Sequence, residues 1–242
     1  HKGWAFRKRS PQLAAAVNDF IRQFGLGTAF GNTIARRYLK NARYAKLGSS
    51  DESVRQYSKY REIFSRYAKQ YEFPPLLVVA AAYQESGLNP NARNPSGAVG
   101  LMQVMPKLAA AKPVSITNVQ NVENNVHAGV RMLKFIRDDY LKDEPMDDMN
   151  KGLMTLASYN AGPARIRSCR KLAEEMGLDP NVWFRNVELA VSRKVGRETV
   201  GYVSNIFKYY LAFRLVEERL DETERARQSA SSPGGAPSPN RE

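Results

Sequence analysis

The chain has 242 residues, 43% of them hydrophobic, and a formal net charge of +13 at neutral pH. This length suits one sizeable domain, or one domain plus a fragment, and no apolar run approaches the length of a membrane span. The lone cysteine, Cys169, excludes an intrachain disulfide. A basic chain suits a polyanionic partner. However, no nucleic-acid-binding motif accompanies the charge here, and basic residues alternate with acids along the expected helices, so we expect no nucleic-acid partner.

Residues 1–45 are expected to form a helical segment of their own. The chain opens at His1 without a methionine or a signal-peptide pattern, which indicates an excised fragment and leaves the compartment open. Ser10-Pro11 predicts the start of a helix that ends at Gly25, and a second short helix is expected over residues 32–39. Residues 41–51, basic and then rich in Gly and Ser, are expected to be a linker.

From Ser53 onward, aromatic residues recur every three or four positions and predict a helix with an aromatic packing face. These residues are Tyr57, Tyr60, Phe64, Tyr67 and Tyr71.

The next helix is the one around which the chain is organised. Pro74-Pro75 predicts its start and Gly87 its end, and the run between them is too uniformly apolar to have a solvent face. Glu85 falls in its last turn, against apolar neighbours and at the negative end of the helix dipole. Desolvation and the dipole both disfavour a carboxylate, so the pKa of Glu85 should be raised. A carboxyl group that stays protonated near neutral pH suits a general acid.

A turn-rich loop over residues 89–100 should return the chain to the end of this helix. Further helices are expected after Pro106, over residues 122–140, 153–159 and 165–176, and from about Arg197, with a less regular segment from Trp183. His127 is expected to be an exposed or hydrogen-bonded helix residue, and the acidic stretch 138–148 a solvated turn rather than a Ca²⁺ site. Residues 226–242 become rich in Ser, Pro and Gly and are expected to be a disordered tail. With hardly any strand pattern, the predicted fold is mostly α.

Three motifs give the chain a specific resemblance. They are Glu85-Ser86-Gly87, then residues 96–106 with the pattern Ser-Gly-Ala-x-Gly-Leu-Met-Gln-x-Met-Pro, and then residues 157–162 with the pattern Ala-x-Tyr-Asn-Ala-Gly. In this order they resemble the signature of the soluble-lytic-transglycosylase (SLT) domain, a member of the lysozyme-like superfamily. The resemblance covers residues 53–225. Residues 4–21 are similar to the end of the periplasmic solute-binding domain that precedes the SLT domain in membrane-bound lytic transglycosylases of the F type.

The resemblance implies an enzyme that cleaves the β-1,4 bond between N-acetylmuramic acid and N-acetylglucosamine in peptidoglycan and leaves 1,6-anhydromuramic ends. Glu85 would act as acid and then as base, with no cofactor and no metal. The substrate-binding residues carried over by matching positions are Ser86, Ser96, Met102, Gln103, Tyr159, Asn160, Glu198 and Tyr202. Met102 is expected to line the sugar cleft or fill core, and Glu198 to stabilise the oxocarbenium ion or pair with an arginine. The implied location is the periplasm, with membrane anchoring, at the outer membrane, through a part of the protein before His1.

The number of carboxylates in the motifs fits this chemistry. Glycosidases normally need two carboxylates, whereas the motifs supply one, and an intramolecular attack by the muramic acid C6 hydroxyl group removes the need for the second. Three alternatives stay open. A goose-type lysozyme would use water and a second acid, Glu198 or one from residues 138–148. A non-catalytic cell-wall-binding scaffold would only hold glycan. A basic nucleic-acid binder rests on charge alone.

Overall fold

The computed structural model describes residue 7, residues 10–24, residue 28, and residues 51–142 and 144–231. The chain divides into two compact units, His1–Lys46 and Leu47–Glu242. In the first unit, helix α1 (Pro11–Phe24) confirms the helix predicted after Ser10. The helix expected over residues 32–39 and the linker before residue 51 lie outside the described residues.

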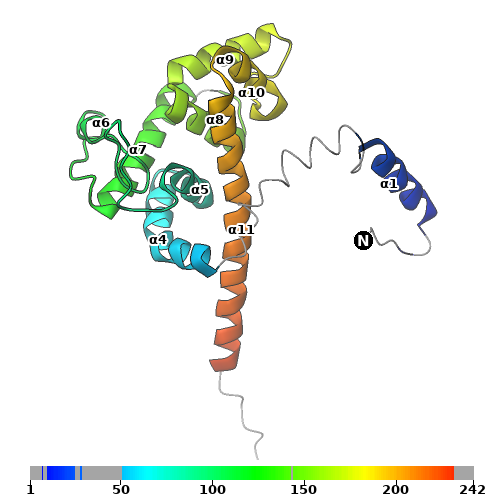
Figure 1. Ribbon diagram of the computed structural model, residues 1–242, viewed down its shortest axis with the longest axis horizontal. Coiled ribbons are helices and arrows are strands. Elements are labelled where there is room, and N and C mark those ends of the chain that lie inside the picture. Colours follow the sequence, from blue (N-terminus) through cyan, green and yellow to red (C-terminus); the bar gives the residue numbers. More distant parts are fainter. Residues whose placement is uncertain (1–6, 8–9, 25–27, 29–50, 143, 232–242) are drawn as a thin grey trace, which may run out of the picture. The chain divides into compact units, whose positions relative to one another are not determined.

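The described part of the second unit is built from helices, which confirms the mostly α prediction (Figure 1). Its only paired extended residues, within that part, are the isolated bridges Arg93–Val99 and Val99–Val104. The elements are α4 (Asp51–Gln70), α5 (Pro75–Ser86), α6 (Pro106–Ala110), α7 (Val122–Tyr140), α8 (Asp148–Ala161), α9 (Pro163–Glu175), the irregular turn η2 (Trp183–Val187), α10 (Glu188–Lys194) and α11 (Arg197–Ser231).

Helix α5 begins and ends where the sequence predicts. Pro75 occupies its first turn, where a missing N–H costs nothing, and Gly87 ends it with a φ of 64°, a left-handed conformation that glycine adopts readily. The helix has no polar face, because its middle residues are buried from Leu77 to Ala82. A helix that is apolar all round must be enclosed by other elements.

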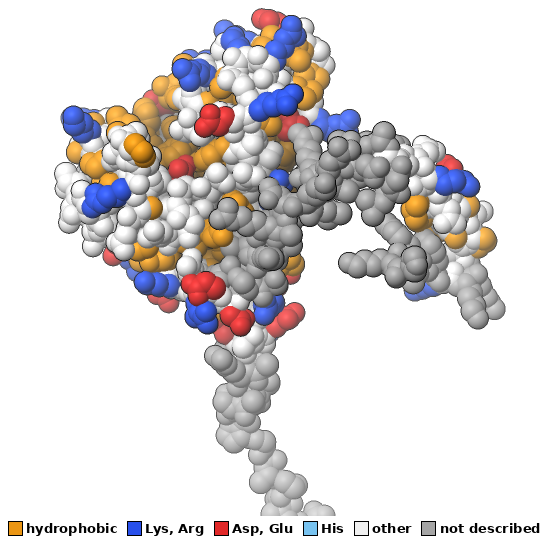
Figure 2. Space-filling view, in the orientation of Figure 1, with side chains coloured by type: hydrophobic (Ala, Val, Ile, Leu, Met, Phe, Trp, Pro, Cys, Tyr) orange, Lys and Arg blue, Asp and Glu red, His pale blue; other side chains and the backbone are white. Residues whose placement is uncertain are grey.

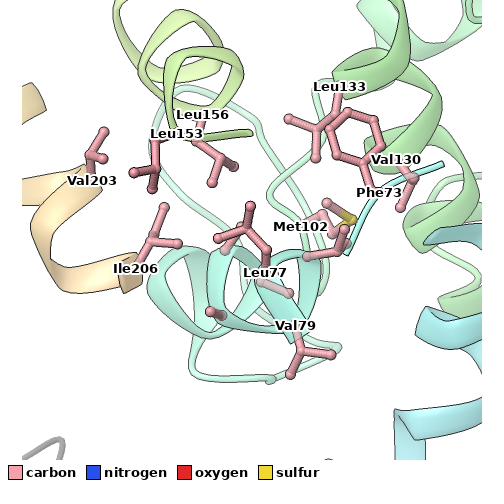
Figure 3. Packing of buried hydrophobic residues seen from close by; sticks show 14 of the residues in the cluster. Phe73, Leu77, Val79, Met102, Val130, Leu133, Leu153, Leu156, Val203 and Ile206 are labelled. Carbon is pink, nitrogen blue, oxygen red and sulfur yellow. The ribbon is translucent and has the colours of Figure 1, made fainter. Parts of the chain in front are cut away.

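Three helices enclose α5. It packs along α11 and also contacts α4, and Figure 3 shows Leu77 of α5 facing side chains of α8 and α11. The residues that surround it in this view include Leu153, Leu156, Val203 and Ile206. The last turn of α5, which carries Glu85, thus continues directly from a helix that is buried by its neighbours.

Helix α11 is a 35-residue rod that passes the whole second unit (Figure 1). Beside α5, the ring of Tyr83 meets those of Tyr209 and Phe213 edge-on, with centroids 4.7 Å and 5.7 Å apart. Further along, Glu217 accepts hydrogen bonds from Tyr57 and Arg61 of α4. The helix continues to Ser231, past residue 226, where the sequence suggests the tail begins. Glu224 still pairs with Arg61 of α4 at 3.7 Å, and good helix formers such as Glu224 and Arg225 favour continuation of the helix.

The acidic stretch 138–148 serves local structure. Asp138 pairs with Lys134 and Arg137, Asp147 caps α8 by accepting from the Asn150 N–H, and Glu144 accepts from Arg170 at 2.6 Å. Among the described residues, no three His, Cys, Asp or Glu side chains are grouped closely enough to hold a metal ion.

His127 is a hydrogen-bonded helix residue, one of the two roles expected for it. Its Nε2 lies 2.6 Å from the Tyr71 hydroxyl, and its ring stacks on Tyr67. In the part of the chain that is described, no helix is both long and apolar enough to cross a membrane.

Candidate active site

Glu85 lies half-buried in the last turn of α5. Burial raises the pKa of its carboxyl group above the ordinary value, because the charged form loses hydration, and a hydrogen bond from Tyr202 opposes this effect. Neither cause is a neighbouring charge, because Tyr202 is a neutral phenol. The pKa therefore moves in the direction that the apolar helix predicts, with desolvation as the main cause.

Two tyrosines from distant helices face this carboxyl group. The hydroxyl of Tyr202, on the second turn of α11, donates to Glu85 Oε1 at 2.7 Å, and the residue is 8% exposed. Tyr159, near the end of α8, donates its hydroxyl to the Met102 carbonyl at 3.1 Å. Burial and the charge of Glu85 raise the pKa of both phenols well above their usual range, so both stay neutral and able to donate.

The loop after α5 returns to the end of that helix, as predicted. Ser86 donates its hydroxyl to the Leu101 carbonyl at 2.8 Å and so ties the residue next to Glu85 to the loop. Gln103 has a φ of 48°, unusual for a residue other than glycine. Its Nε2 donates to the carbonyls of Gly100 at 2.9 Å and Ala92 at 3.3 Å, which satisfy the amide nitrogen within the loop.

Three of the expected substrate contacts lie at the exposed edge of this region. Ser96 is exposed and donates to Asn94 at 2.7 Å, so its hydroxyl stabilises the loop rather than Glu85. Asn160 is exposed, and its Oδ1 accepts from the Thr199 hydroxyl at 2.8 Å, which joins the end of α8 to the start of α11. Glu198 is exposed in the first turn of α11, one helical turn before Tyr202.

Met102 takes one of the two roles expected for it. Its side chain fills core rather than lining a sugar cleft, because the residue is 2% exposed. Its side chain packs against Gly129 of α7 so closely that a Cβ at that glycine would lie 2.4 Å from the Met102 Sδ. Figure 3 shows it directed toward Phe73, Val130 and Leu133. The part of Met102 that faces the site is its carbonyl oxygen, which receives the Tyr159 hydroxyl.

Two residues that hold the site together were not among the site residues expected from the sequence. Thr199 is 4% exposed and fixes Asn160, and Asn125 is 1% exposed and binds the returning loop. The available signal for Asn125 is a polar residue beside the apolar positions Val122, Val126 and Val130 of α7. A polar residue on a buried face must have partners, but the sequence does not show where those partners lie.

Figure 2 shows a depression, lined mainly by hydrophobic side chains, between the part of the molecule that carries α6 and α7 and the part that carries α9 and α10. An acid whose main perturbation is desolvation, flanked by two neutral phenols, can donate a proton to a ligand and accept one back. The site is therefore suited to acid–base chemistry with a single carboxyl group.

The chain belongs, over residues 62–180, to the family of the transglycosylase SLT domain, whose model matches this range. The match covers α5 with Glu85, the returning loop, and Tyr159.

Two related proteins are both named as lytic transglycosylases. The chain is 33% identical over 245 residues to a membrane-bound lytic murein transglycosylase F of Shewanella sediminis, an alignment that covers 93% of this chain and 46% of that protein. It is 28% identical over 223 residues to the protein of that name from Desulfosudis oleivorans, covering 86% and 48%. The chain thus spans about half of the length of these relatives.

A solved structure is similar to this chain at lower sequence identity. The 70 kDa soluble lytic transglycosylase of Escherichia coli aligns with a TM-score of 0.48 and 24% identity, covering 84% of this chain and 33% of that one.

Proposed function

We propose that this chain is the catalytic part of a peptidoglycan lytic transglycosylase, and that Glu85 is its single acid and base. Membership of the SLT family supports the class of reaction. The observation that carries the assignment to Glu85 is its half-buried position at the end of α5, with its pKa raised by desolvation and its carboxyl group hydrogen-bonded to Tyr202.

The reaction begins with proton transfer from Glu85 to the oxygen of the β-1,4 bond that links N-acetylmuramic acid to N-acetylglucosamine. The bond from the muramic acid C1 to that oxygen breaks, and N-acetylglucosamine leaves with a free hydroxyl group. The muramic acid C6 hydroxyl group then attacks C1, and Glu85, now a carboxylate, takes the hydroxyl proton. The product is a 1,6-anhydro ring, and Glu85 is protonated again without any water being consumed.

This route explains why one carboxyl group suffices. The attacking hydroxyl belongs to the same sugar as C1, so it has the large effective molarity of an intramolecular group. Tyr202 orients the Glu85 carboxyl group and favours its charged form through the 2.7 Å hydrogen bond. The oxygen of Tyr159, whose hydroxyl proton is donated to the Met102 carbonyl, is proposed to direct a lone pair toward the positive charge that develops at C1. Gln103, Asn160 and Glu198 are proposed to contact the glycan from the loop and from the exposed ends of α8 and α11.

The first test replaces the acid. Glu85→Gln keeps the shape of the side chain and removes the proton, so release of soluble fragments from purified sacculi should fall by on the order of 1000-fold. The exposed Glu175→Gln on α9 is the matched control and should retain full activity. A Glu85→Gln protein that digests sacculi at the normal rate would exclude Glu85 as the acid.

The second test identifies the product. Mass spectrometry of the soluble fragments should show muramic acid ends in the anhydro form. Ends that are heavier by one water would instead indicate hydrolysis, as expected for a goose-type lysozyme. The same experiment on Glu198→Gln separates the two reactions further, because only the hydrolytic route needs a second carboxylate.

A further inference from the structure

The side chain of Asn125 is fully buried on α7, and all its hydrogen-bonding groups except one acceptor site are in use. Its Nδ2 donates to the carbonyls of Val99 and Val119, each at 2.9 Å, and its Oδ1 accepts from the Met102 N–H at 2.9 Å. Because the oxygen faces an N–H and the nitrogen faces two carbonyls, only this orientation of the amide satisfies all three partners. Asn125 is thus hydrogen-bonded to both ends of the turn from Val99 to Met102.

The backbone of this turn lies unusually close to α7. Gly100 has a φ of 77°, and a Cβ there would lie 2.3 Å from Asn125 Nδ2, so only glycine allows the approach. One helical turn further on, Gly129 makes room for Met102, whose Sδ and Cβ would be 2.4 Å and 2.8 Å from a Cβ at that position. Asn125 and Gly129 therefore both fix Met102, one through a hydrogen bond to its backbone N–H and the other through close packing against its side chain.

The turn to which Asn125 is hydrogen-bonded also accepts hydrogen bonds from two residues around Glu85. The carbonyl of Met102 receives the hydroxyl of Tyr159 at 3.1 Å, and the carbonyl of Leu101 receives the hydroxyl of Ser86 at 2.8 Å. A shift of the Met102 peptide would move the Tyr159 phenol relative to the acid. The raised pKa of Tyr159, to which the charge of Glu85 contributes, is consistent with a short distance between the two groups.

We propose that Asn125 is a positioning residue that sets the place of the Tyr159 phenol beside Glu85 through the Met102 peptide. This inference rests on the proposed function. Asn125 itself touches no substrate, and its effect on turnover passes through Tyr159.

The test is a double-mutant cycle measured on soluble peptidoglycan strands. Asn125→Asp is close in shape and places an oxygen against the carbonyls of Val99 and Val119, which repels the turn. A displacement of about 1 Å can cost on the order of 100-fold in rate, so kcat should fall by about that factor. In a Tyr159→Phe background, the same substitution should cost only a few-fold, because the group through which Asn125 acts is already lost.

The control for this substitution is Asn124→Asp, one residue earlier on the same helix. The Asn124 side chain donates only to the carbonyls of Thr117 and Asn118, at 3.1 Å and 3.4 Å, and does not reach the turn. Asn124→Asp should lower the stability of the protein slightly. It should leave kcat within about two-fold of the parent value, both with Tyr159 and with Phe at position 159.

A purely structural role for Asn125 predicts a different result. Loss of folded protein would reduce kcat by the same factor with Tyr159 and with Phe at that position, and such additivity would overturn the proposal. If Asn125→Asp fails to fold, Gly129→Ala tests the same claim, since it displaces Met102 without removing a hydrogen bond, and it should show the same non-additivity. Full activity of Glu85→Gln would overturn the proposed function itself, whereas additive cycles with an inactive Glu85→Gln would overturn only the role of Asn125.

Discussion

Two opposing effects act on the carboxyl group of Glu85. Desolvation at the end of α5 favours the protonated form, and the hydrogen bond from Tyr202 favours the charged form. An acid that must become a base within one turnover needs both forms to be accessible. The hydrogen bond from the Tyr202 hydroxyl therefore limits how far burial can raise the pKa of Glu85.

Tyr202→Phe should raise the pKa of Glu85 further, because it removes the group that stabilises the carboxylate. The acid stays protonated to higher pH, so the alkaline limb of the kcat profile should move upward while kcat at the optimum falls. Tyr210→Phe, on the same helix, is the matched control, because it also removes one hydroxyl group but leaves the Glu85 bond in place. An alkaline limb that moves down in Tyr202→Phe would contradict this account of the pKa.

Glu85 should also make the stability of the protein depend on pH. Its pKa is raised in the folded state, so its protonated form favours folding below the ordinary glutamate pKa, and this contribution is lost as the pH rises through the folded-state value. Glu85→Gln carries no such penalty. The variant should melt at a higher temperature than the parent protein at neutral pH and at a similar temperature at about pH 3, well below the ordinary glutamate pKa, where Glu85 is protonated in both states. Equal melting temperatures at both pH values would show that Glu85 ionises without cost.

At the scale of the helices, glycines show where packing is tight. Gly152 of α8 lies against α5, and a Cβ there would be 2.6 Å from Leu77 Cδ2 in the buried core. Gly201 of α11 has no atom within 4 Å of such a Cβ. The same substitution should therefore have opposite effects at two helical positions of one domain.

Gly152→Ala should destabilise the protein, because overpacking costs roughly 1–3 kcal/mol and the gain in helix propensity returns only about 1 kcal/mol. Gly201→Ala should stabilise it by up to about 1 kcal/mol, since helix propensity acts without a clash. Urea unfolding followed by circular dichroism measures both. A stabilising Gly152→Ala would mean that Leu77 has room to move and that the α5–α8 contact is looser than described.

The helices and the return of the loop after α5 were the predictable parts of this fold, and the detailed conformation of that loop was not. The proline before α5 and the glycine after it defined that helix from local chemistry alone, as did the aromatic period of α4. The left-handed φ of Gln103 and the buried bonds of Asn125 depend on residues far apart in the sequence, for which a single sequence has no signal. Met102 shows the same limit, because its motif position was known but the direction of its side chain was not.

For the whole molecule, the net charge of +13 becomes relevant once the proposed substrate is considered. Peptidoglycan is anionic, and a basic protein gathers on an anionic polymer through long-range attraction that salt screens. This attraction depends on the net charge of the entire protein and not on the geometry of the site. The amino-acid composition is therefore sufficient to predict it.

Retention of Glu85→Gln on purified sacculi should fall several-fold as salt is raised from about 0.01 M to about 1 M, where the screening length drops from about 30 Å to about 3 Å. A pull-down assay that uses the inactive variant measures binding without turnover. The melting temperature at each salt concentration serves as the control for folding. Retention that does not change with salt would assign binding to the contacts of the site alone.

The apolar character of α5 has a consequence for how the protein opens. Backbone amides from Val78 to Ala82 are covered on all sides, so their hydrogens should exchange with solvent only when the entire second unit unfolds. Glu85 lies at the end of this helix, which should be the last part of the unit to unfold. Its partners Tyr159 and Tyr202 belong to α8 and α11, whose ends near the site are exposed. Partial opening by heat or denaturant should therefore abolish turnover by releasing the partners while the glutamate itself stays in place.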